Sequence, residues 1–354
     1  MTIDKSKPVL VTGATGFVAG WVVKRLLEEG ITVHAAVRNP DKIEKRAHLD
    51  KLAAELPGDI KYFKSDLLIE GSYKEAMEGC ELVIHTASPF ITDVKDPQKE
   101  LIDPAVKGTR NVLELANEID TVKRVVLTSS CAAIYTDCTD LENVPNKILT
   151  EDIWNTTSSL TNQPYSFSKT LAEKEAWRIV EGQDRWDLVV VNPSMVIGPA
   201  LNPSTNTSES FSLMKQLGDG TMKAGVPNAG IGVVDVRDLA EAHFQAGFRP
   251  EAKGRHIING HNSGFLELAT ELAKDFGDKY PIPKKALPKW LLLIVGPIVN
   301  KAITRHWVRN NINHTWQADN SKSKRELEIN YHPLRESMRD GFQQIIDSGV
   351  IPAK

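Results

Sequence analysis

Short apolar runs separated by segments of helical periodicity limit the fold of this chain more than any other feature. We predict strands at six of these runs: Val9 to Val11, Ile31 to Val37, Ile60 to Phe63, Leu82 to His85, Arg124 to Thr128 and Leu188 to Val191. Because helices separate the strands, the strands should lie parallel in one sheet with right-handed crossovers. The pattern predicts an α/β fold built on a doubly wound parallel sheet, in which ligands bind beyond the carboxyl ends of the strands.

A glycine turn follows the first strand directly. After Val11 the chain reads Thr12-Gly13-Ala14-Thr15-Gly16-Phe17-Val18-Ala19, which predicts a turn and the start of a helix. Gly13 permits a tight backbone turn, Gly16 lets the main chain approach a pyrophosphate, and Ala19 is small enough for close packing of helix on strand. Since the free N–H groups of a helix N-terminus attract phosphate, the turn is a candidate dinucleotide site; a plain structural turn is the alternative.

The end of the second strand bears on the choice of cofactor. An acidic residue there would bind the ribose hydroxyls of NAD but would repel a 2′-phosphate. In this chain the strand is followed by Arg38, whose guanidinium can grip phosphate oxygens, and Lys45 on the next predicted helix adds positive charge. We therefore expect NADP rather than NAD, the alternative being that Arg38 is an ordinary solvated arginine.

A tyrosine and a lysine stand four residues apart on a helix predicted to begin after Pro164. The spacing places Tyr165 and Lys169 on one face, about one turn apart. Such pairs are common on solvated helices, but this helix is expected next to the strand that ends in Thr128-Ser129-Ser130. A phenol in that place can protonate a carbonyl oxygen as hydride reaches the carbonyl carbon, so the pair predicts hydride-transfer chemistry.

This chemistry sets a condition on the surroundings of the phenol. Lowering a phenol pKa by about 3 units takes about 4 kcal/mol, and an ammonium about 4 Å away supplies that only at an effective dielectric of about 20. We therefore expect Lys169 to lower the pKa of Tyr165 in a partly dehydrated site. Ser130 should hold the substrate oxygen near the phenol. Ser129 is the competing choice, because neighbouring strand residues face opposite sides.

The pattern changes after Val191. Residues 202–210 are rich in Pro, Ser, Thr and Asn and predict a mobile loop that could serve as a lid. Gly232 to Val234 predicts a short strand, followed by a helix from Asp235 to Ala240 in which we take Asp235 as a structural cap. Helical spacing resumes at Phe265. We expect residues 1–191 and 232–262 to form the NADP-binding domain, and residues 192–231 and 263–354 a smaller C-terminal substrate-binding lobe.

Composition narrows the classes of partner. A formal charge of −3 over 354 residues gives no basic field for nucleic acid. Cys80, Cys131 and Cys138 are too few and too irregularly spaced for a disulfide framework, and the nine histidines show no metal-ligand spacing. The charged start of the chain does not resemble a secretory signal. We expect a cytoplasmic protein without a metal, and we interpret Cys131 as a small buried residue rather than a nucleophile.

One apolar stretch, Trp290 to Val299, lies between basic residues: Lys284, Lys285 and Lys289 before it, and Lys301, Arg305 and Arg309 after it. The stretch is too short to span a bilayer and contains Pro297, so we predict no membrane span. We interpret it as a helix packed into the lobe, and the alternative is a segment that covers substrate or lies on a membrane surface.

These motifs together resemble the extended short-chain dehydrogenases/reductases, and within them the group of dihydroflavonol reductase, cinnamoyl-CoA reductase and methylglyoxal reductase. The resemblance covers nearly the whole chain. Its carriers are Thr12 to Ala19, Val37-Arg38-Asn39-Pro40, Asp66-Leu67, His85-Thr86-Ala87-Ser88-Pro89, Thr128-Ser129-Ser130, Tyr165-Ser166-Phe167-Ser168-Lys169, and Asn192-Pro193-Ser194-Met195-Val196-Ile197-Gly198-Pro199. The chain departs from the plant members in residues 155–163 and 202–210, which bears on whether its substrate is a flavonoid or a CoA ester.

The resemblance implies a Rossmann fold, NADPH and a Ser-Tyr-Lys site. It assigns the second serine, Ser130, to the substrate oxygen, Tyr165 to proton donation and Lys169 to the nicotinamide ribose. It places the glycine-turn residues at the cofactor, including Thr15, Phe17 and Val18. It also implies Asp66 and Leu67 near the adenine, and Thr86, Ala87, Pro193 and Val196 near the ribose and nicotinamide.

The expected substrate is a small molecule with a carbonyl group. Phe90, Ile91 and the run Ala132 to Ile134 follow strand ends and could line an apolar pocket for an aldehyde, ketone or α-dicarbonyl, or be ordinary core. Two rival functions are an NAD-dependent nucleotide-sugar epimerase or dehydratase and a non-catalytic NADP-sensing protein. Predicted helices at 97–117 and 164–181 could form a dimer face or just cover the sheet, so monomer and homodimer are both open.

Overall fold

The computed structural model describes residues 1–88, 94–203, 208–300 and 303–353. Its main sheet has seven parallel strands in the order β10-β6-β5-β4-β1-β2-β3. The strands are β1 (Val9–Thr12), β2 (Thr32–Val37), β3 (Asp59–Lys64), β4 (Leu82–His85), β5 (Arg124–Thr128), β6 (Asp187–Pro193) and β10 (Gly254–Ile258). All six strands predicted from apolar runs are confirmed, as is the doubly wound α/β fold.

The seventh strand, β10, is not among the predicted runs. It begins Gly-Arg-His, and both Arg255 and His256 are buried, at 7 % and 0 % exposed. Each polar side chain has an acidic partner from elsewhere in the chain: Arg255 pairs with Glu173 and His256 with Glu326. Because buried positions of β10 hold polar residues, β10 lacks the apolar run that marks the other strands in the sequence. Its place in the sheet is explained only by the long-range pairs with Glu173 and Glu326.

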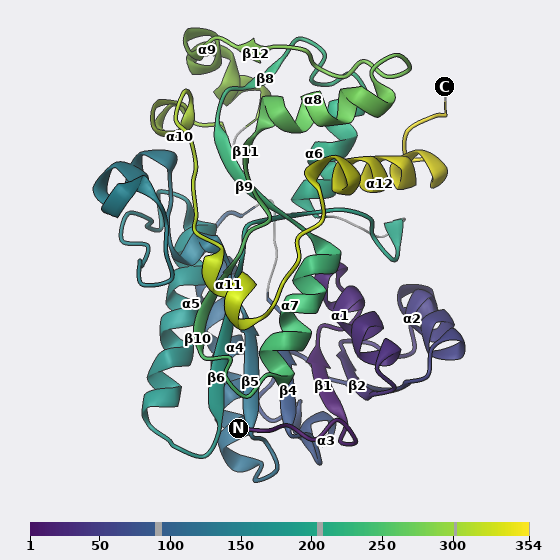
Figure 1. Cartoon of the computed structure of the whole chain (residues 1–354). Coiled ribbons are helices and arrows are strands. Elements are labelled where there is room, and N and C mark those ends of the chain that lie inside the picture. The colour runs from purple at the N-terminus through teal and green to yellow at the C-terminus, as the bar shows by residue number, and fades with distance from the viewer. Residues whose placement is uncertain (89–93, 204–207, 301–302, 354) are drawn as a thin grey trace.

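Helices cover both faces of the main sheet (Figure 1). One face packs against α1, α2 and α7, and the other against α3, α4 and α5. These helices are α1 (Phe17–Glu28), α2 (Ile43–Glu55), α3 (Lys74–Met77), α4 (Asp103–Glu118), α5 (Pro164–Glu181) and α7 (Val236–Phe248), with the short η1 (Gln98–Ile102) leading into α4. Strands covered in this way bury Val, Leu and Ile on both sides, which explains their unbroken apolar sequences.

The remaining elements form a smaller lobe beyond the carboxyl ends of the main strands (Figure 1). It contains the three-stranded sheet β11-β9-β7 and the pair β12-β8. Its elements are β7 (Met195–Ile197), β8 (Val226–Pro227), β9 (Gly230–Asp235), β11 (His261–Gly264), β12 (Ala286–Leu287), α6 (Glu209–Gly218), α8 (Phe265–Phe276), α9 (Lys289–Val299), α10 (Arg305–Asn311) and α12 (Leu334–Asp347). The lobe has its own core, in which Leu217, Val233, Leu272 and Phe342 are buried.

The chain passes between the main sheet with its helices and the smaller lobe more than once. The predicted strand and helix at 232–240 are confirmed as β9 and α7, and Asp235 caps α7 by accepting the N–H of Arg237 at 2.8 Å. β9 pairs with β7 and β11, whereas α7 packs on α1, and β10 then joins the main sheet. The short helix α11 (Ser321–Glu326) lies against β10.

Strand order reverses between β1 and β4. The chain runs from β1 outward through β2 and β3, and then returns to the other side of β1 as β4. In doubly wound sheets the crevice for a ligand opens at this point, outside the carboxyl ends of the strands. Within the described residues, no helix is long and apolar enough to cross a membrane.

Candidate active site

The glycine turn lies at the carboxyl end of β1, beside the point where strand order reverses. Gly13 has φ +66°, and a Cβ there would lie 3.2 Å from the Cβ of Ala87, so a larger residue would meet both strain and contact. The N–H of Gly16 donates to the carbonyl of Gly13 at 2.9 Å, which closes the turn, and α1 starts at the next residue. The first N–H groups of α1 therefore have no helical acceptor and face the crevice.

A buried threonine and histidine brace this turn against β4, and sequence reasoning missed both roles. Thr12 Oγ1 accepts the N–H groups of Thr86 at 3.1 Å and Ala87 at 3.0 Å, and it lies 2.8 Å from His85 Nδ1. Because the oxygen already accepts two hydrogen bonds, its own proton goes to Nδ1, which assigns the histidine proton to Nε2. Burial lowers the pKa of His85 to about 3, and the charge of Lys169 acts in the same direction, so the ring is neutral.

The two cations predicted for the cofactor follow β2. Arg38 is the first residue beyond the strand and is exposed, and Lys45 is exposed in the first turn of α2. Asp66 and Leu67 follow β3, where the Asp66 carboxylate accepts the N–H of Leu68 at 2.9 Å and Leu67 packs against Gly108 of α4. The chain thus brings all four residues to the β2–β3 side of the crevice.

The two serines after β5 take different partners. Ser129 is 5 % exposed and donates its hydroxyl to the Glu173 carboxylate at 2.5 Å. Ser130 Oγ accepts the N–H of Ala132 at 3.1 Å, and its hydroxyl acts on the Tyr165 phenol by opposing the rise in pKa that burial causes. Because neighbouring side chains of an extended chain point to opposite sides, Ser129 faces the interior and Ser130 faces the phenol of Tyr165. The sequence alone could not separate these two serines.

Tyr165 and Lys169 lie one turn apart at the start of α5. Tyr165 is 39 % exposed, whereas Lys169 is 8 % exposed. Burial lowers the pKa of Lys169 to about 8, and the negative charge of Glu173 opposes that shift. Lys169 lies in a small cavity whose wall includes His85, Ser129 and Glu173.

The direction of the phenol shift differs from our expectation. Loss of hydration around the ring raises the pKa of Tyr165 above its usual value, the nearby charge of Glu209 raises it further, and the Ser130 hydroxyl opposes both. The prediction that Lys169 lowers this pKa is therefore wrong for this arrangement. Glu209, the first residue of α6, was not found from sequence because it is 44 positions from Tyr165 and adjoins the polar tract at 202–210.

Glu173 is the centre of a buried polar network behind the site. It lies one turn after Lys169 on α5 and is 1 % exposed. Besides Ser129, its carboxylate accepts Asn192 Nδ2 at 2.8 Å and Arg255 Nε at 2.6 Å. Arg255 also donates to the carbonyls of Glu151 and Ile153 at 2.8 and 2.6 Å. The network joins α5, β5, β6 and β10, so three other elements hold the end of β5 in place.

Other expectations have mixed outcomes. Pro193 ends β6 and Val196 lies in β7, so both follow the main sheet at its carboxyl edge. Cys131 is 3 % exposed, which confirms it as a small buried residue, and burial raises the pKa of its thiol. Ala133 and Ile134 are buried core, not pocket lining.

Phe90, Ile91 and residues 204–207 of the expected lid lie outside the described residues, whereas residues 209 and 210 belong to α6.

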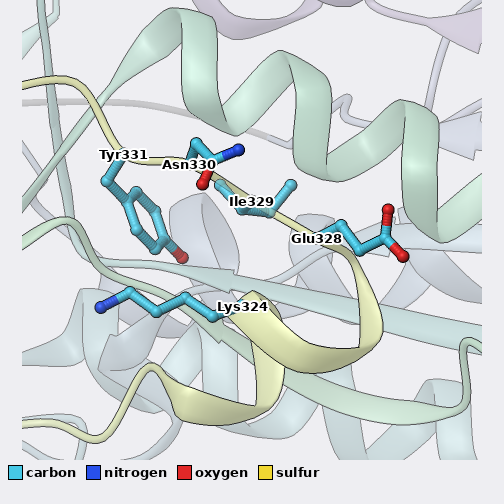
Figure 2. A pocket seen from close by; sticks show the side chains of 5 residues that line it. All are labelled: Lys324, Glu328, Ile329, Asn330 and Tyr331. Atoms are coloured by element: carbon cyan, nitrogen blue, oxygen red, sulfur yellow. The ribbon is translucent and has the colours of Figure 1, made fainter.

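A larger hollow lies elsewhere, on the segment after α11 (Figure 2). Its walls are Lys324, Glu328, Ile329, Asn330 and Tyr331, none of which belongs to the predicted site. Clusters of histidine, cysteine or carboxylate side chains that could hold a metal do not occur in the part of the chain that the structure describes.

Known proteins share both the sequence and the fold. Residues 9–259 match the family model of the NAD dependent epimerase/dehydratase family. The chain is 44 % identical over 270 residues to a cinnamoyl-CoA reductase of Medicago truncatula, covering 75 % of this chain and 80 % of that one. It is 34 % identical over 350 residues to a cinnamoyl-CoA reductase of Petunia hybrida, covering 97 % and 93 %.

A similar solved structure is that of yeast methylglyoxal/isovaleraldehyde reductase Gre2 complexed with NADPH. It superposes with a TM-score of 0.77 at 27 % identity, covering 97 % of this chain and 99 % of that one. The fold, the position of the glycine turn where strand order reverses, and these matches all indicate the same family. The chain therefore belongs to the NAD-dependent epimerase/dehydratase family, the extended short-chain dehydrogenases/reductases.

Proposed function

We propose that this protein is an NADPH-dependent reductase that converts aldehydes or ketones to alcohols. The observation that carries the proposal is the convergence of Ser130, which acts on the Tyr165 phenol, and Lys169, one turn further along α5, at the carboxyl edge of the sheet. Cinnamoyl-CoA reductases among the relatives and a structural neighbour complexed with NADPH support the same chemistry and the same cofactor.

The residues present fit a dinucleotide with a 2′-phosphate. Gly13 keeps the turn open at a place where a Cβ would meet Ala87, and the start of α1 directs N–H groups into the crevice. Arg38 and Lys45 are exposed cations beyond β2, where an NAD site would have an acid. In our assignment the cofactor contacts Gly13, Thr15, Gly16, Phe17, Val18, Arg38, Lys45, Asp66, Leu67, Thr86, Ala87, Tyr165, Lys169, Pro193 and Val196.

The chain's own groups then handle the substrate oxygen. NADPH, when bound, supplies the hydride. Ser130 Oγ holds the carbonyl oxygen, and Tyr165 Oη, whose raised pKa keeps it protonated at neutral pH, donates a proton as negative charge develops on that oxygen. Lys169, with a pKa of about 8, is mostly an ammonium at neutral pH and stabilises the phenolate that remains.

The proposal also assigns the parts of the chain. Residues 1–191 and 232–262 supply the NADP-binding domain, except that β9 and β11 pair in the sheet of the smaller lobe; residues 192–231 and 263–354 supply the substrate lobe that keeps water from the reacting groups, with Pro193 and Val196 reaching the cofactor from its first residues. Cytoplasmic location is supported by the three cysteines, all of which are free and buried.

A substrate screen combined with one variant tests the proposal. Purified protein is offered aldehydes, diketones, flavanonols and steroids while NADPH consumption is followed. Tyr165→Phe should lower kcat on any substrate found by about 10²- to 10⁴-fold, since it removes the general acid, with little change in NADPH affinity. The matched control is Tyr331→Phe. The hydroxyl of Tyr331 lies 2.8 Å from that of Ser323, and the side chain of Tyr331 lines the hollow shown in Figure 2.

Two results would contradict this function. Tightly bound NAD in the purified protein, with no NADPH consumption on any carbonyl, would favour an epimerase or dehydratase. Turnover that is equal in the wild type, Tyr165→Phe and Tyr331→Phe would remove Tyr165 from the chemistry, and NADPH binding without turnover of any carbonyl would leave a cofactor-binding protein.

A further inference from the structure

Helix α9 has one packed face and one bare apolar face. Leu292 and Gly296 are buried, and a Cβ on Gly296 would lie 2.7 Å from Ile303, so this side is fitted closely to the segment that leads into α10. Lys289 Nζ donates to the carbonyls of Arg309 and Ile312 at 2.9 and 3.1 Å, which ties the start of α9 to the end of α10. The helix is therefore held firmly by one side only.

The opposite face of α9 exposes large apolar side chains to solvent. Trp290, Ile294 and Ile298 are 64 %, 59 % and 81 % exposed, and their spacing of four places them along one stripe. Val299 next to them is 75 % exposed. Of the eleven large hydrophobic residues exposed in the described part of the chain, five belong to this helix of 11 residues. Apolar surface concentrated in this way marks a contact site, whereas single exposed hydrophobics do not.

The sequence around the stripe is cationic, although the whole chain is slightly acidic. Residues 279–318 contain no aspartate or glutamate and seven lysines and arginines: Lys279, Lys284, Lys285, Lys289, Lys301, Arg305 and Arg309. Lys284, Lys285, Arg305 and Arg309 are exposed. Among the residues that the structure describes, none of these four forms a salt bridge, so their charge is available to an outside partner.

Acidic groups do approach this region, but from its inner side. Asp137 accepts Asn311 Nδ2 at 2.5 Å and faces His306, and Glu142 lies 3.7 Å from His314. Both carboxylates come from the turn at 137–143, which packs against α10. Within the described residues, neither carboxylate forms a salt bridge with Lys284, Lys285, Arg305 or Arg309.

We propose that the α9 surface, formed by Trp290, Ile294, Ile298 and Val299 with the flanking Lys284, Lys285, Arg305 and Arg309, docks on an anionic lipid surface. A short helix with an indole and branched aliphatic side chains on one face and cations at its borders can lie in the headgroup plane with its apolar face inserted. Its length is too small for spanning. The helix lies at the end of the smaller lobe that is far from the N-terminus (Figure 1), so docking there leaves the main sheet clear of the bilayer.

Charge argues against a second copy of the chain as the occupant. A two-fold contact through this stripe would bring the same patch of each copy together. The cations of one copy would then face the identical cations of the other, with no carboxylate between residues 279 and 318 to separate them. An anionic bilayer satisfies both the apolar stripe and its cations.

Sedimentation with vesicles tests this proposal independently of any substrate. The full-length protein is mixed with vesicles of phosphatidylcholine alone or with about a third phosphatidylserine, at low and high salt. Binding is expected only to the anionic vesicles and should weaken at high salt. The variant Ile294→Asp/Ile298→Asp should lower the apparent affinity at least about tenfold, and Lys284→Glu/Lys285→Glu should have an effect of similar size.

Matched controls separate docking from damage to the fold. Ile69→Asp changes an isoleucine that is 60 % exposed, as Ile294 is, and Lys51→Glu reverses a lysine that is 75 % exposed on α2. Both controls should bind vesicles like the wild type, and all variants should keep its thermal unfolding midpoint. Equal loss in the controls, binding to neutral vesicles as strong as to anionic ones, or a dimer in solution that Ile294→Asp/Ile298→Asp abolishes would each overturn the proposal.

Discussion

Adjacent residues in this chain can have separate tasks, as Ser129 and Ser130 show. The hydroxyl of Ser129 is committed to Glu173 inside the protein, whereas that of Ser130 meets Tyr165 at the crevice. We predict that Ser130→Ala lowers kcat by about 10²-fold or more with little loss of stability, because it removes a donor to the substrate oxygen. Ser129→Ala is the matched comparison and should instead lower the unfolding free energy by about 1 to 3 kcal/mol.

The measurements are steady-state kinetics and urea unfolding on the two variants side by side. If Ser129→Ala were inactive but stable, and Ser130→Ala active but less stable, the roles of the two serines would be exchanged. Equal effects of both variants on kcat would mean that the backbone of the β5 end, rather than one hydroxyl, positions the substrate.

Arg38 is the residue on which cofactor choice depends. It is exposed after β2, where a 2′-phosphate would lie if the glycine turn holds the pyrophosphate. Arg38→Ala should raise KM for NADPH about tenfold or more, because a charge-assisted hydrogen bond is lost, and should leave KM for NADH nearly unchanged. Kinetics with both cofactors check this prediction, and a parallel rise in the two constants would contradict it.

At the scale of elements, the Glu173–Arg255 pair joins helix α5 to strand β10. Both side chains are buried, at 0 % and 7 % exposed, so removing one charge leaves the other without compensation. Glu173→Gln should lower the unfolding free energy by about 3 to 5 kcal/mol, and Glu173→Leu with Arg255→Met should recover much of it. The surface pair Lys24–Glu28 is the control, and Glu28→Gln should change stability by less than about 1 kcal/mol.

The same substitution has a separate signature in the pH profile. The charge of Glu173 raises the pKa of Lys169 against the effect of burial. In Glu173→Gln the lysine should lose its proton at a pH below the present value of about 8, so activity should start to fall at lower pH than in the wild type. Lower stability with an unmoved pH profile would reduce Glu173 to a purely structural group.

At the scale of the whole molecule, buried histidines link stability to pH. Burial lowers the pKa of His85 to about 3 and that of His243 to about 4, from an ordinary value of 6.5. His243 is held neutral between Thr128 Oγ1 at 2.7 Å and the carbonyl of Leu239 at 2.7 Å. Between the folded and unfolded values the unfolded chain binds more protons, so stability falls as the pH drops below 6.5.

Each of these two histidines should cost about 2 kcal/mol at pH 5 relative to pH 7 or above. Urea unfolding at the two pH values measures the total change, to which His256, with its pKa lowered by burial to about 4, also contributes. His243→Gln should be less stable at pH 7, since it disturbs two buried hydrogen bonds, but should lose about 2 kcal/mol less on acidification. Identical urea midpoints at pH 7 and pH 5 in the wild type would contradict the assignment.

Much of the architecture is local in sequence and could be predicted for that reason. Five of the six apolar strands need only their own residues to show that they are covered on both faces, whereas β3, at the edge of the sheet, alternates half-buried and exposed residues. The turn at Gly13 and Gly16 is legible because it follows the first strand. The four-residue spacing of Tyr165 and Lys169 places both on one face of any helix that contains them.

Tertiary structure alone decided what depends on residues far apart in the chain. The polar strand β10 exists as part of the sheet because Glu173, 82 positions before Arg255, offers it a buried partner. Ser130 is distinguished from Ser129 by what each hydroxyl meets, the phenol pKa rises because of loss of hydration and the charge of Glu209, and α9 is left half bare because only one of its faces finds a neighbour. Periodicity reports which residues can be buried; only the folded chain determines which groups surround them, and hydration and charge follow from those surroundings.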